Sequence, residues 1–476
     1  MPTAKLPWPP RLEPRSTAYL PGSYTLNACF EKDGNGDVWV IKRDGYQIQT
    51  DYASAGYGFY QDQNNSTYAV TYAALRYNGI NILNSPDPTD IYWFNQTNGV
   101  PNYTYLSNGA VGYSVAAGVA TQITDAVYTG TIGVTVPGSA FLDGTLYVMN
   151  QKAQIYGSKN LNNPTVWDAL NVITAQDTPG LGVALAKHLV YVVAFKDKSV
   201  EFFYDAGAYA GTTTGSPLLP TQQYKLDYGC YSGHSVTDVE GTLYWVGCTQ
   251  SGQPNVMRLQ GLKPERISTP DVERFLLGIS GSALNGYWYK SEGHNYYVIA
   301  PFLVTTLPTH SVRVLTPTPG CLAYDIATGE WSYTTNTAFF HGMYGGTPGS
   351  TGKQYGLTTA GQLCYTQDGS PVYLDSTSPI TTTLTTLPYD GGTQKVKVLS
   401  KLYILADWYE AGALQVRWSD DDYKTWSQWV TVPLNQNRPM LTNLGSFRRR
   451  AFQFQHTSNS PFRMKGAEMD LLLGDR

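Results

Sequence analysis

Few stretches of the chain contain residue types whose spacing could support chemistry. The segment TPGSTGKQ (347–354) has the Gly-Lys pair of a phosphate-binding loop, but Thr347 and Gln354 stand where such a loop needs Gly and Ser or Thr. The segment DGNGDVWV (33–40) begins like a calcium loop, yet Val38 occupies the sixth position, where the sharp turn needs glycine. We therefore expect a surface loop in the first segment and a hairpin turn in the second.

The histidines are scattered, and no two of them have the spacing of a zinc motif. No Gly-x-Ser-x-Gly segment is present to expose a nucleophilic serine. We expect structural roles for the six histidines, which are His188, His234, His294, His310, His341 and His456. The sequence therefore predicts no catalytic residue, no metal site and no cofactor.

A cluster of short polar side chains lies in the C-terminal segment RWSDDDYKTWSQW. Its residues Ser419, Asp421, Thr425 and Trp426 resemble the Asp-box of sialidases and related propellers, Ser-x-Asp-x-Gly-x-Thr-Trp, with Tyr423 at the glycine position. The Asp and Ser of such a box bind turn backbone, so the box predicts a hairpin. Glycoside hydrolysis would need two carboxyl groups at a set separation, which scattered acids do not reveal.

Three consecutive arginines, Arg448, Arg449 and Arg450, begin a strand-like pattern near the C-terminus. One interpretation is a basic patch that contacts another subunit or a partner protein. The other is internal pairing with the acidic run at 420–422. Replacing all three should abolish assembly but not folding under the first interpretation, and should disturb folding under the second.

Composition limits the class of partner. Charged residues make up 14% of the 476 residues, against about 25% in ordinary globular proteins, while the chain contains 37 Tyr. Tyrosine is enriched at protein interfaces, and Tyr, Thr and Val also favour strands. The net charge is −4, without the basic excess by which nucleic-acid binders neutralise phosphates. We expect no DNA-gripping groove, although a channel through which DNA slides is compatible with this charge.

The five cysteines are too few and too irregular for a disulfide framework. Cys230 and Cys248 lie at equal distances from Val239 on a likely hairpin and could be cross-strand neighbours, but we expect reduced thiols. The proline-broken start has no apolar signal-peptide core, and no apolar run reaches the ~18 residues of a transmembrane helix. We expect a soluble protein made in a cytoplasm, with no membrane insertion.

Short strand-like runs bounded by turn residues dominate the chain. The phrases DGTLYVMN (143–150) and EGTLYWVG (240–247) each place a glycine, Gly144 or Gly241, where a tight turn needs positive φ. We expect both phrases to be entrances to hairpins in one kind of repeated unit, with the following leucines buried. Irregularly spaced hairpins over hundreds of residues predict an all-β fold with an irregular β-propeller core.

Changes in composition suggest the domain organisation. We expect an extended N-terminal segment (1–33) that docks on the other domains, a propeller (34–375) and a C-terminal β-sandwich or barrel-like domain (376–476). Within residues 96–142, Asp125 is the only charged residue, and we expect a protruding β-rich insertion there.

The order of several motifs resembles the packaged-DNA stabilisation proteins of short-tailed bacteriophages, also called tail hub or nozzle proteins. The C-terminal order WSDDDYKTWSQW, LGSFRRRAFQF and SPFRMKGAEMDL is similar to the end of that family. The segments STAYLPGSYTLNACFEKDG (16–34), KSVEFFYDAGAYAGTTTGSPL (198–218) and YDIATGEW match it in the same order. Residues 96–142 have no counterpart in the resemblance.

The resemblance implies a structural virion protein with a propeller core and no catalytic residues. A homohexamer would form a ring below the portal and its adaptor ring, continue and close the DNA channel, and permit ejection. Its implied partners are the adaptor protein, a distal needle or tip protein, a tail fibre or spike, and DNA that passes through the lumen without sequence-specific binding. The implied location is the short virion tail, assembled in the host bacterial cytoplasm.

The alternative is a β-propeller that binds or hydrolyses glycans, in keeping with the Asp-box-like segment. A six-fold ring in the tails of intact particles would favour the hub. A stable monomer that binds or cleaves a glycan would favour the alternative.

Overall fold

The computed structural model describes residues 3–8, 24–207, 215–306, 313–317, 320–335, 339, 344–345, 353–367, 372–410 and 412–474. Several sequence expectations lie wholly or partly outside these residues: most of the N-terminal segment 1–33 with the Tyr-Leu-Pro motif, the Gly- and Thr-rich run 208–214, the loop at 347–352, His310 and His341. Most described residues lie in strands, as the β-branched and aromatic runs predict.

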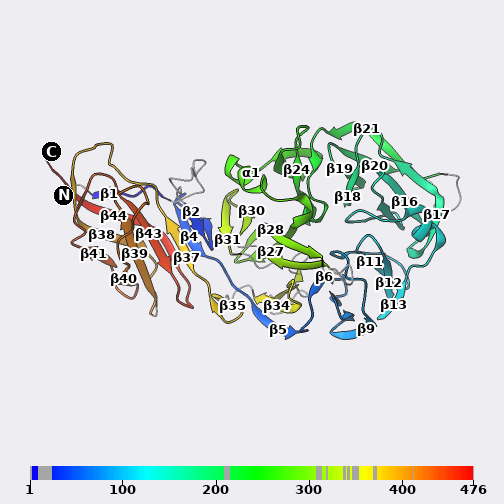
Figure 1. The fold of residues 1–476 in the computed structure, drawn as a ribbon, viewed down its shortest axis with the longest axis horizontal. Helices are drawn as coiled ribbons and strands as arrows, with labels where there is room; N and C mark the ends of the chain where they lie inside the picture. Colours follow the sequence, from blue (N-terminus) through cyan, green and yellow to red (C-terminus); the bar gives the residue numbers. More distant parts are fainter. Residues whose placement is uncertain are drawn as a thin grey trace.

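Seven successive antiparallel sheets of the described chain lie around a common centre and form a β-propeller (Figure 1). The first four are β6 Gly56–Gln61, β7 Thr67–Thr71, β8 Ala74–Tyr77, β9 Ile80–Asn84; β10 Trp93–Gln96, β11 Thr104–Ser107, β12 Gly112–Ala116, β13 Val119–Gln122; β14 Ala140–Leu142, β15 Thr145–Met149, β16 Gln154–Asn160, β17 Asn163–Thr174; β18 Gly182–His188, β19 Tyr191–Lys196, β20 Val200–Asp205, β21 Leu218–Leu226. The other three are β22 Gly229–Cys230, β23 Thr237–Val239, β24 Thr242–Cys248, β25 Pro254–Gln260, β26 Lys263–Arg266; β27 Leu284–Ser291, β28 His294–Thr306, β29 Arg313–Pro317, β30 Cys321–Asp325, β31 Trp331–Thr334; β32 Tyr344–Gly345, β33 Lys353–Leu357, β34 Gln362–Gln367 and β5 Gln47–Asp51.

The ring is closed by a strand from the other end of the chain. The outermost strand of the seventh sheet, β5, pairs with β34, so that Ile48 lies opposite Cys364. Pairing an early strand with a late one joins the first and last sheets, which limits the number of open sheet edges.

The repeated phrases form the same turn in the third and fifth sheets. Each connects the paired strands through two residues, Asp143-Gly144 and Glu240-Gly241, and all four have positive φ. Positive φ at both central residues is what a two-residue type I′ hairpin requires. The leucines that follow, Leu146 and Leu243, are both buried in antiparallel strands, which confirms the structural interpretation of the repeat.

The turn at Gly241 provides a mild, local test of this reading. Gly241 has φ +83° and open space around the position of an added Cβ. Gly241→Ala should therefore cost about 1 kcal/mol through backbone strain alone, and Gly241→Asn should cost less because Asn tolerates left-handed φ. Urea denaturation of both variants measures the difference, and equal losses in the two would contradict the turn geometry.

Residues 96–142 do not form the protruding insertion that their lack of charge suggested. They supply β11, β12 and β13 of the second sheet, the connection to the third sheet and its first strand, β14. Tyr105 is fully buried, and its hydroxyl lies 2.8 Å from that of Tyr128 in a core shared by these two sheets. Part of the segment is therefore core of the propeller, where its tyrosine hydroxyls pair with each other instead of with charged groups.

A β-sandwich lies beside the propeller, and both chain ends lie at its far side (Figure 1). One of its layers contains β1 Thr3–Lys5, β3 Ala28–Lys32, β4 Val38–Lys42, β38 Lys397–Ala406, β41 Met440–Thr442, β42 Ser446–Phe447 and β44 Arg463–Leu473. The other contains β2 Tyr24–Leu26, β37 Thr382–Thr385, β39 Ala413–Ser419, β40 Val430–Pro433 and β43 Ala451–His456, while β35 Leu374–Asp375 and β36 Ser378–Pro379 form a small hairpin nearby. Inward-facing apolar residues of both layers, such as Phe30, Leu402 and Phe454, share one core.

The sandwich extends beyond the 376–476 segment assigned to it from composition. Strand β4, which we placed in the propeller, pairs with β44, and β3 pairs with β4. The physical reason is the core: Ala28, Phe30 and Val40 are buried against C-terminal side chains. Strand β2 also runs parallel to β31 of the sixth propeller sheet, so one ten-stranded sheet continues from that sheet into the sandwich.

Helices are short and few in the described part of the chain. They are α1 Pro270–Leu276, the 3₁₀ turns Gly233–Ser235 and Gly281–Ala283, and the π-helical segment Val127–Ile132. Among the described residues, no helix has the length and apolar character needed to cross a membrane.

Candidate functional site

The joint between propeller and sandwich is organised by one buried arginine. Arg43 lies in the connection from β4 to β5, and both oxygens of Asp375 accept hydrogen bonds from its guanidinium, at 2.9 and 2.5 Å. Arg43 Nε donates to Asn27 Oδ1 at 2.9 Å, and Nη2 donates to Thr335 Oγ1 at 2.8 Å. Burial by itself lowers the pKa of Arg43, but the facing carboxylate of Asp375 outweighs it and the pKa is raised. The charge is thus retained and fully paired.

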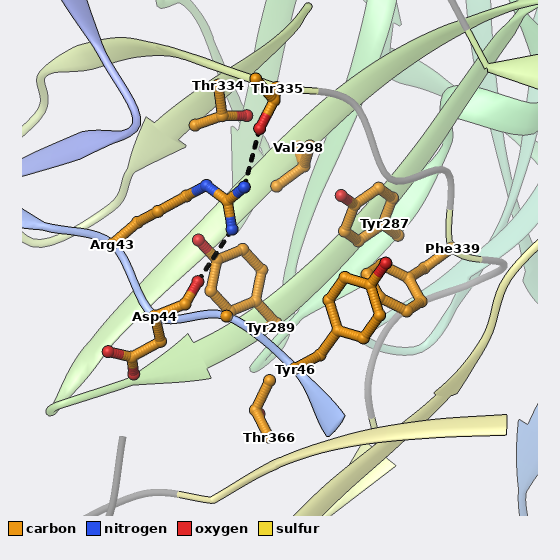
Figure 2. A pocket seen from close by; sticks show the side chains of 11 residues that line it. Arg43, Asp44, Tyr46, Tyr287, Tyr289, Val298, Thr334, Thr335, Phe339 and Thr366 are labelled. Carbon is orange, nitrogen blue, oxygen red and sulfur yellow. Dashed lines mark hydrogen bonds between the residues drawn. The ribbon is translucent and has the colours of Figure 1, made fainter. Parts of the chain in front are cut away.

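Aromatic rings close the joint on the propeller side. Figure 2 shows Arg43 reaching toward Thr335, with Tyr46, Tyr287, Tyr289 and Phe339 beside it. The Phe339 ring lies 5.5 Å from that of Tyr46 and 5.6 Å from that of Tyr287, both edge to face. The cavity that remains is about 40 Å³, which suits water-sized groups. The site can fix the angle between the two bodies through these contacts.

The Asp-box-like segment forms a tight turn after β39 of the sandwich. Asp421 accepts hydrogen bonds from Thr425 N at 2.9 Å and Thr425 Oγ1 at 2.6 Å, and from Ser419 Oγ at 2.8 Å. Tyr423, which stands in place of glycine, has φ +69° and donates its hydroxyl to Thr386 O. Trp426 packs 5.9 Å from the Tyr423 ring.

The low pKa of Asp421 argues against acid catalysis at this turn, because its carboxyl group is deprotonated at neutral pH. The hydrogen bonds from Thr425, together with that from Ser419, lower the pKa of Asp421 to about 2. A glycosidase acid needs the opposite, a raised pKa that keeps its proton near neutrality. The turn therefore serves as a hairpin device.

The three consecutive arginines separate into different environments. Arg450 is 1% exposed, and Asp420 accepts two of its hydrogen bonds at 2.6 and 2.7 Å, so Arg450 is not available to a partner. Arg449 makes a half-exposed ion pair with Asp422 at 3.2 Å. Arg448 is exposed and donates to Gln394 O. The structure thus favours internal pairing for Arg450 and leaves the guanidinium groups of Arg448 and Arg449 at the surface.

Cys230 and Cys248 are neighbours on paired strands but do not face one another. The register places Cys230 opposite Gly247 and Cys248 opposite Gly229. An offset of one residue turns the two side chains to opposite faces of the sheet. All five cysteines are buried free thiols, and burial raises the pKa of Cys248 to about 11.

The calcium-like stretch at 33–40 is a hairpin turn stabilised by a lysine. Asp33 Oδ1 accepts hydrogen bonds from the backbone N–H groups of Asn35 and Asp37. Lys465 from β44 places its ammonium 2.5 Å from Asp37 and 3.4 Å from Asp33. The acidic side chains are therefore neutralised by a cation of the protein itself.

His456 forms a buried cluster with Lys42 at the sandwich end of the joint. Its Nδ1 lies 3.5 Å from Lys42 Nζ, and Lys42 donates to Ser458 O at 2.7 Å. Burial, and then the charge of Lys42, lowers the pKa of His456 to about 3. Burial and the charge of Arg43 lower the pKa of Lys42 to about 8. His456 is accordingly neutral in the folded protein at neutral pH.

This cluster predicts a pH dependence of stability. The unfolded His456 has a pKa near its ordinary ~6.5, so between pH 6.5 and 3 the unfolded chain binds a proton that the folded chain does not. Stability is therefore lost as pH falls through this window. Glutamine does not titrate, so on acidification to pH 4.5 the His456→Gln variant should gain about 2–3 kcal/mol of stability relative to the native chain. Urea denaturation at pH 7.5 and pH 4.5 measures the change.

His294 provides a control of opposite sign. Its Nδ1 lies 2.8 Å from Asp325 Oδ2, and this hydrogen bond raises its pKa. Its contribution is present below about pH 6.5 and is lost as pH rises through the folded pKa. On acidification, His294→Gln should therefore lose stability relative to the native chain. If His294→Gln and His456→Gln changed in the same direction, the opposite pKa shifts of the two histidines would be contradicted.

The joint residues were missed by sequence reasoning. Arg43 and Asp375 are 332 positions apart, and neither belongs to a local motif. The one local signal is the break between strand patterns on either side of Arg43.

Comparisons with known proteins identify the family but give little further detail. A family model described as bacteriophage P22 Gp10, beta-propeller, matches residues 60–316, more than half of the chain. None of the curated proteins matches.

The solved structures that match do so at low sequence identity and low TM-score. The extracellular domain of a hybrid two-component system from B. thetaiotaomicron is 11% identical with a TM-score of 0.42, and the match covers 87% of this chain and 58% of that one. This chain thus spans less than two thirds of that structure. The WD40 domain of Pan2 from Neurospora crassa is 9% identical with a TM-score of 0.37, covering 70% of this chain and 97% of that one. These scores support no statement about function.

The family match covers the described propeller from its first sheet into its sixth. The all-β propeller agrees with that match. The chain therefore belongs to the bacteriophage P22 Gp10 β-propeller family of packaged-DNA stabilisation proteins.

Proposed function

We propose that this chain is a tail hub, or nozzle, protein of a short-tailed phage. Six copies form a ring below the portal and the adaptor, and the ring continues the DNA channel and retains the packaged genome until ejection. The observation that carries this proposal is the family match over residues 60–316. The structural phage role of that family accounts for the coarse function, and the ring, its copy number and its position are the proposed part.

The charge and the architecture agree with such a ring. A net charge of −4 suits a wall along which DNA slides, because phosphate-binding proteins instead carry clustered positive charge. The ten-stranded sheet and the Arg43–Asp375 pair join propeller and sandwich directly. A subunit that must keep a channel closed against internal pressure benefits from such a rigid connection.

Arg448 and Arg449 are candidates for contact with a neighbouring subunit or the adaptor. Both lie at the surface of the sandwich, and the ion pair of Arg449 with Asp422 is half exposed. Exposed pairs contribute little to folding, about 0–1 kcal/mol, so these side chains can be redirected to a partner at small cost. The distal needle or tip protein and a fibre or spike remain further proposed partners.

The experiment is electron microscopy of purified particles together with particles produced without this chain. The expected result is a six-fold ring of this protein in the tail, and heads that package DNA but lose it when the chain is absent. Absence of the protein from particles, a ring of another symmetry, or full DNA retention without it would overturn the proposal. The double variant Arg448→Glu/Arg449→Glu tests the contact separately. Its incorporation into particles should fall, whereas that of the surface control Arg258→Glu in the propeller should not change.

A further inference from the structure

A cavity of about 510 Å³ lies at the centre of the propeller. Its lining comes from residues in or next to six successive sheets. Strands β6, β10, β18 and β27, each innermost in its sheet, contribute together with the segment 137–139 just before β14, and the fifth sheet adds the segment 233–238 and Leu243. The volume falls in the range of about 300–1,000 Å³ that is typical of small-molecule sites. The cavity is thus formed by the fold itself, and it shares no lining residue with the joint at Arg43.

Two polar groups in the wall of this cavity have no partner. Trp93 is 5% exposed, and its indole Nε1 makes no hydrogen bond. The His234 side chain is 10% exposed, and its Nδ1 is likewise unpaired, while Nε2 lies 3.6 Å from Asp90. An unsatisfied buried polar group costs about 1–3 kcal/mol, and most native structures avoid it. Both groups belong to residues that line the same cavity, with ring centroids 6.1 Å apart.

The remaining lining indicates the chemistry of a ligand. Tyr60, Phe94 and Trp288 add aromatic surface to that of Trp93, and the Tyr60 and Phe94 rings are stacked at 5.4 Å. Lys187 and Asp238 bring one charge of each sign. A strongly anionic ligand would meet Asp238, and a strongly cationic one would meet Lys187. The wall therefore suits a ligand with an apolar face and several uncharged polar groups.

We propose that this axial cavity binds a saccharide of one or two sugar units. A hydroxyl group both donates and accepts, so it can accept from Trp93 Nε1–H and pair with His234 Nδ1 in either protonation state. The ring faces of the sugar can lie on the aromatic side chains, which is how largely apolar pockets with few polar groups orient ligands. The proposal concerns binding without a reaction and goes beyond the hub function, which stands or falls independently.

The test uses the full-length chain and a fixed set of sugars. Saturation-transfer NMR is run with galactose, rhamnose, N-acetylglucosamine, glucuronic acid and lactose, and hits are measured by calorimetry. At least one sugar is expected to bind, and Trp93→Phe and His234→Phe are each expected to weaken it about tenfold, the loss of one buried hydrogen bond. Trp93→Phe keeps an aromatic ring and removes only the donor and part of the ring area.

Trp167→Phe is the matched control. Trp167 belongs to the same core cluster as Trp93, but its Nε1 already donates to Pro164 O at 2.9 Å and it does not line the cavity. Its replacement should leave sugar binding unchanged. Binding by none of the sugars, or equal affinity in native chain and both cavity variants, would overturn the proposal.

A second measurement does not depend on the folding of any variant. In the native chain labelled with ¹⁵N-tryptophan, the indole resonance assigned to Trp93 should move on titration with the bound sugar while that of Trp167 stays fixed. A stationary Trp93 resonance at saturation would place the sugar elsewhere and refute the axial site.

Discussion

Replacing Arg43 with methionine is expected to lower the free energy of unfolding by about 3–5 kcal/mol. The variant removes a buried cation and leaves Asp375 and Asn27 without the partner that joins them. Breaking one side of a buried pair is costly because the remaining charge stays desolvated. The loss should fall on the joint, so that sandwich and propeller unfold in separate steps under urea.

Two further variants give this prediction its controls. Arg258→Met removes a surface pair with Glu265, in which the carboxylate is half exposed, and should cost no more than about 1 kcal/mol. Arg43→Met combined with Asp375→Leu should recover part of the loss, because no charge is then left buried alone. If Arg43→Met lowered the free energy of unfolding no more than Arg258→Met does, the aromatic rings and the shared sheet would hold the joint together without the ion pair.

Arg450→Met is the second large effect, about 2–3 kcal/mol, and it should appear in the sandwich alone, because the Leu444 carbonyl loses its donor while Asp420, 43% exposed, can be rehydrated. The guanidinium donates to Asp420 and to Leu444 O and lies 4.5 Å from the Phe447 ring. All of these contacts are lost together, and both Asp420 and the Leu444 carbonyl lose a donor.

Its neighbours in the run are matched controls for the same substitution. Arg448→Met and Arg449→Met remove exposed guanidinium groups and should each change stability by less than about 1 kcal/mol. Fluorescence-detected urea denaturation of the three variants compares them directly. Equal losses for all three would contradict the separation of buried and surface arginines.

Local features of the fold were predictable from sequence, because the interactions that form them lie within a few residues. The turns at Gly144 and Gly241 need positive φ, which glycine adopts readily. The β-branched and aromatic residues that follow each turn indicate a strand. The Ser419–Thr425 turn was predictable for the same reason, since its hydrogen bonds span at most four positions.

Features that depend on distant partners were not predictable. Nothing near Val38 indicates that its strand pairs with β44, because the deciding contacts are with side chains of the C-terminal core. The low charge of residues 96–142 suggested a protruding segment, whereas the hydroxyl groups of Tyr105 and Tyr128 form a hydrogen bond with each other inside the propeller. The axial cavity requires six sheets to converge, and its unpaired groups on Trp93 and His234 become evident only in three dimensions.

The pairing of the early strand β5 with the late strand β34 determines when the propeller can close during synthesis of the chain. Gln362 bonds Asp51 across 311 positions, and Arg463 pairs with Glu31 across 432. At about 5–20 residues per second, the early strands wait roughly 15 seconds to a minute for the partners that complete the ring, and longer for those of the sandwich. The propeller cannot close before β34 has emerged, and the sandwich cannot finish before β44 has emerged. A nascent chain that ends before β34 can therefore hold neither the closed propeller nor the finished sandwich.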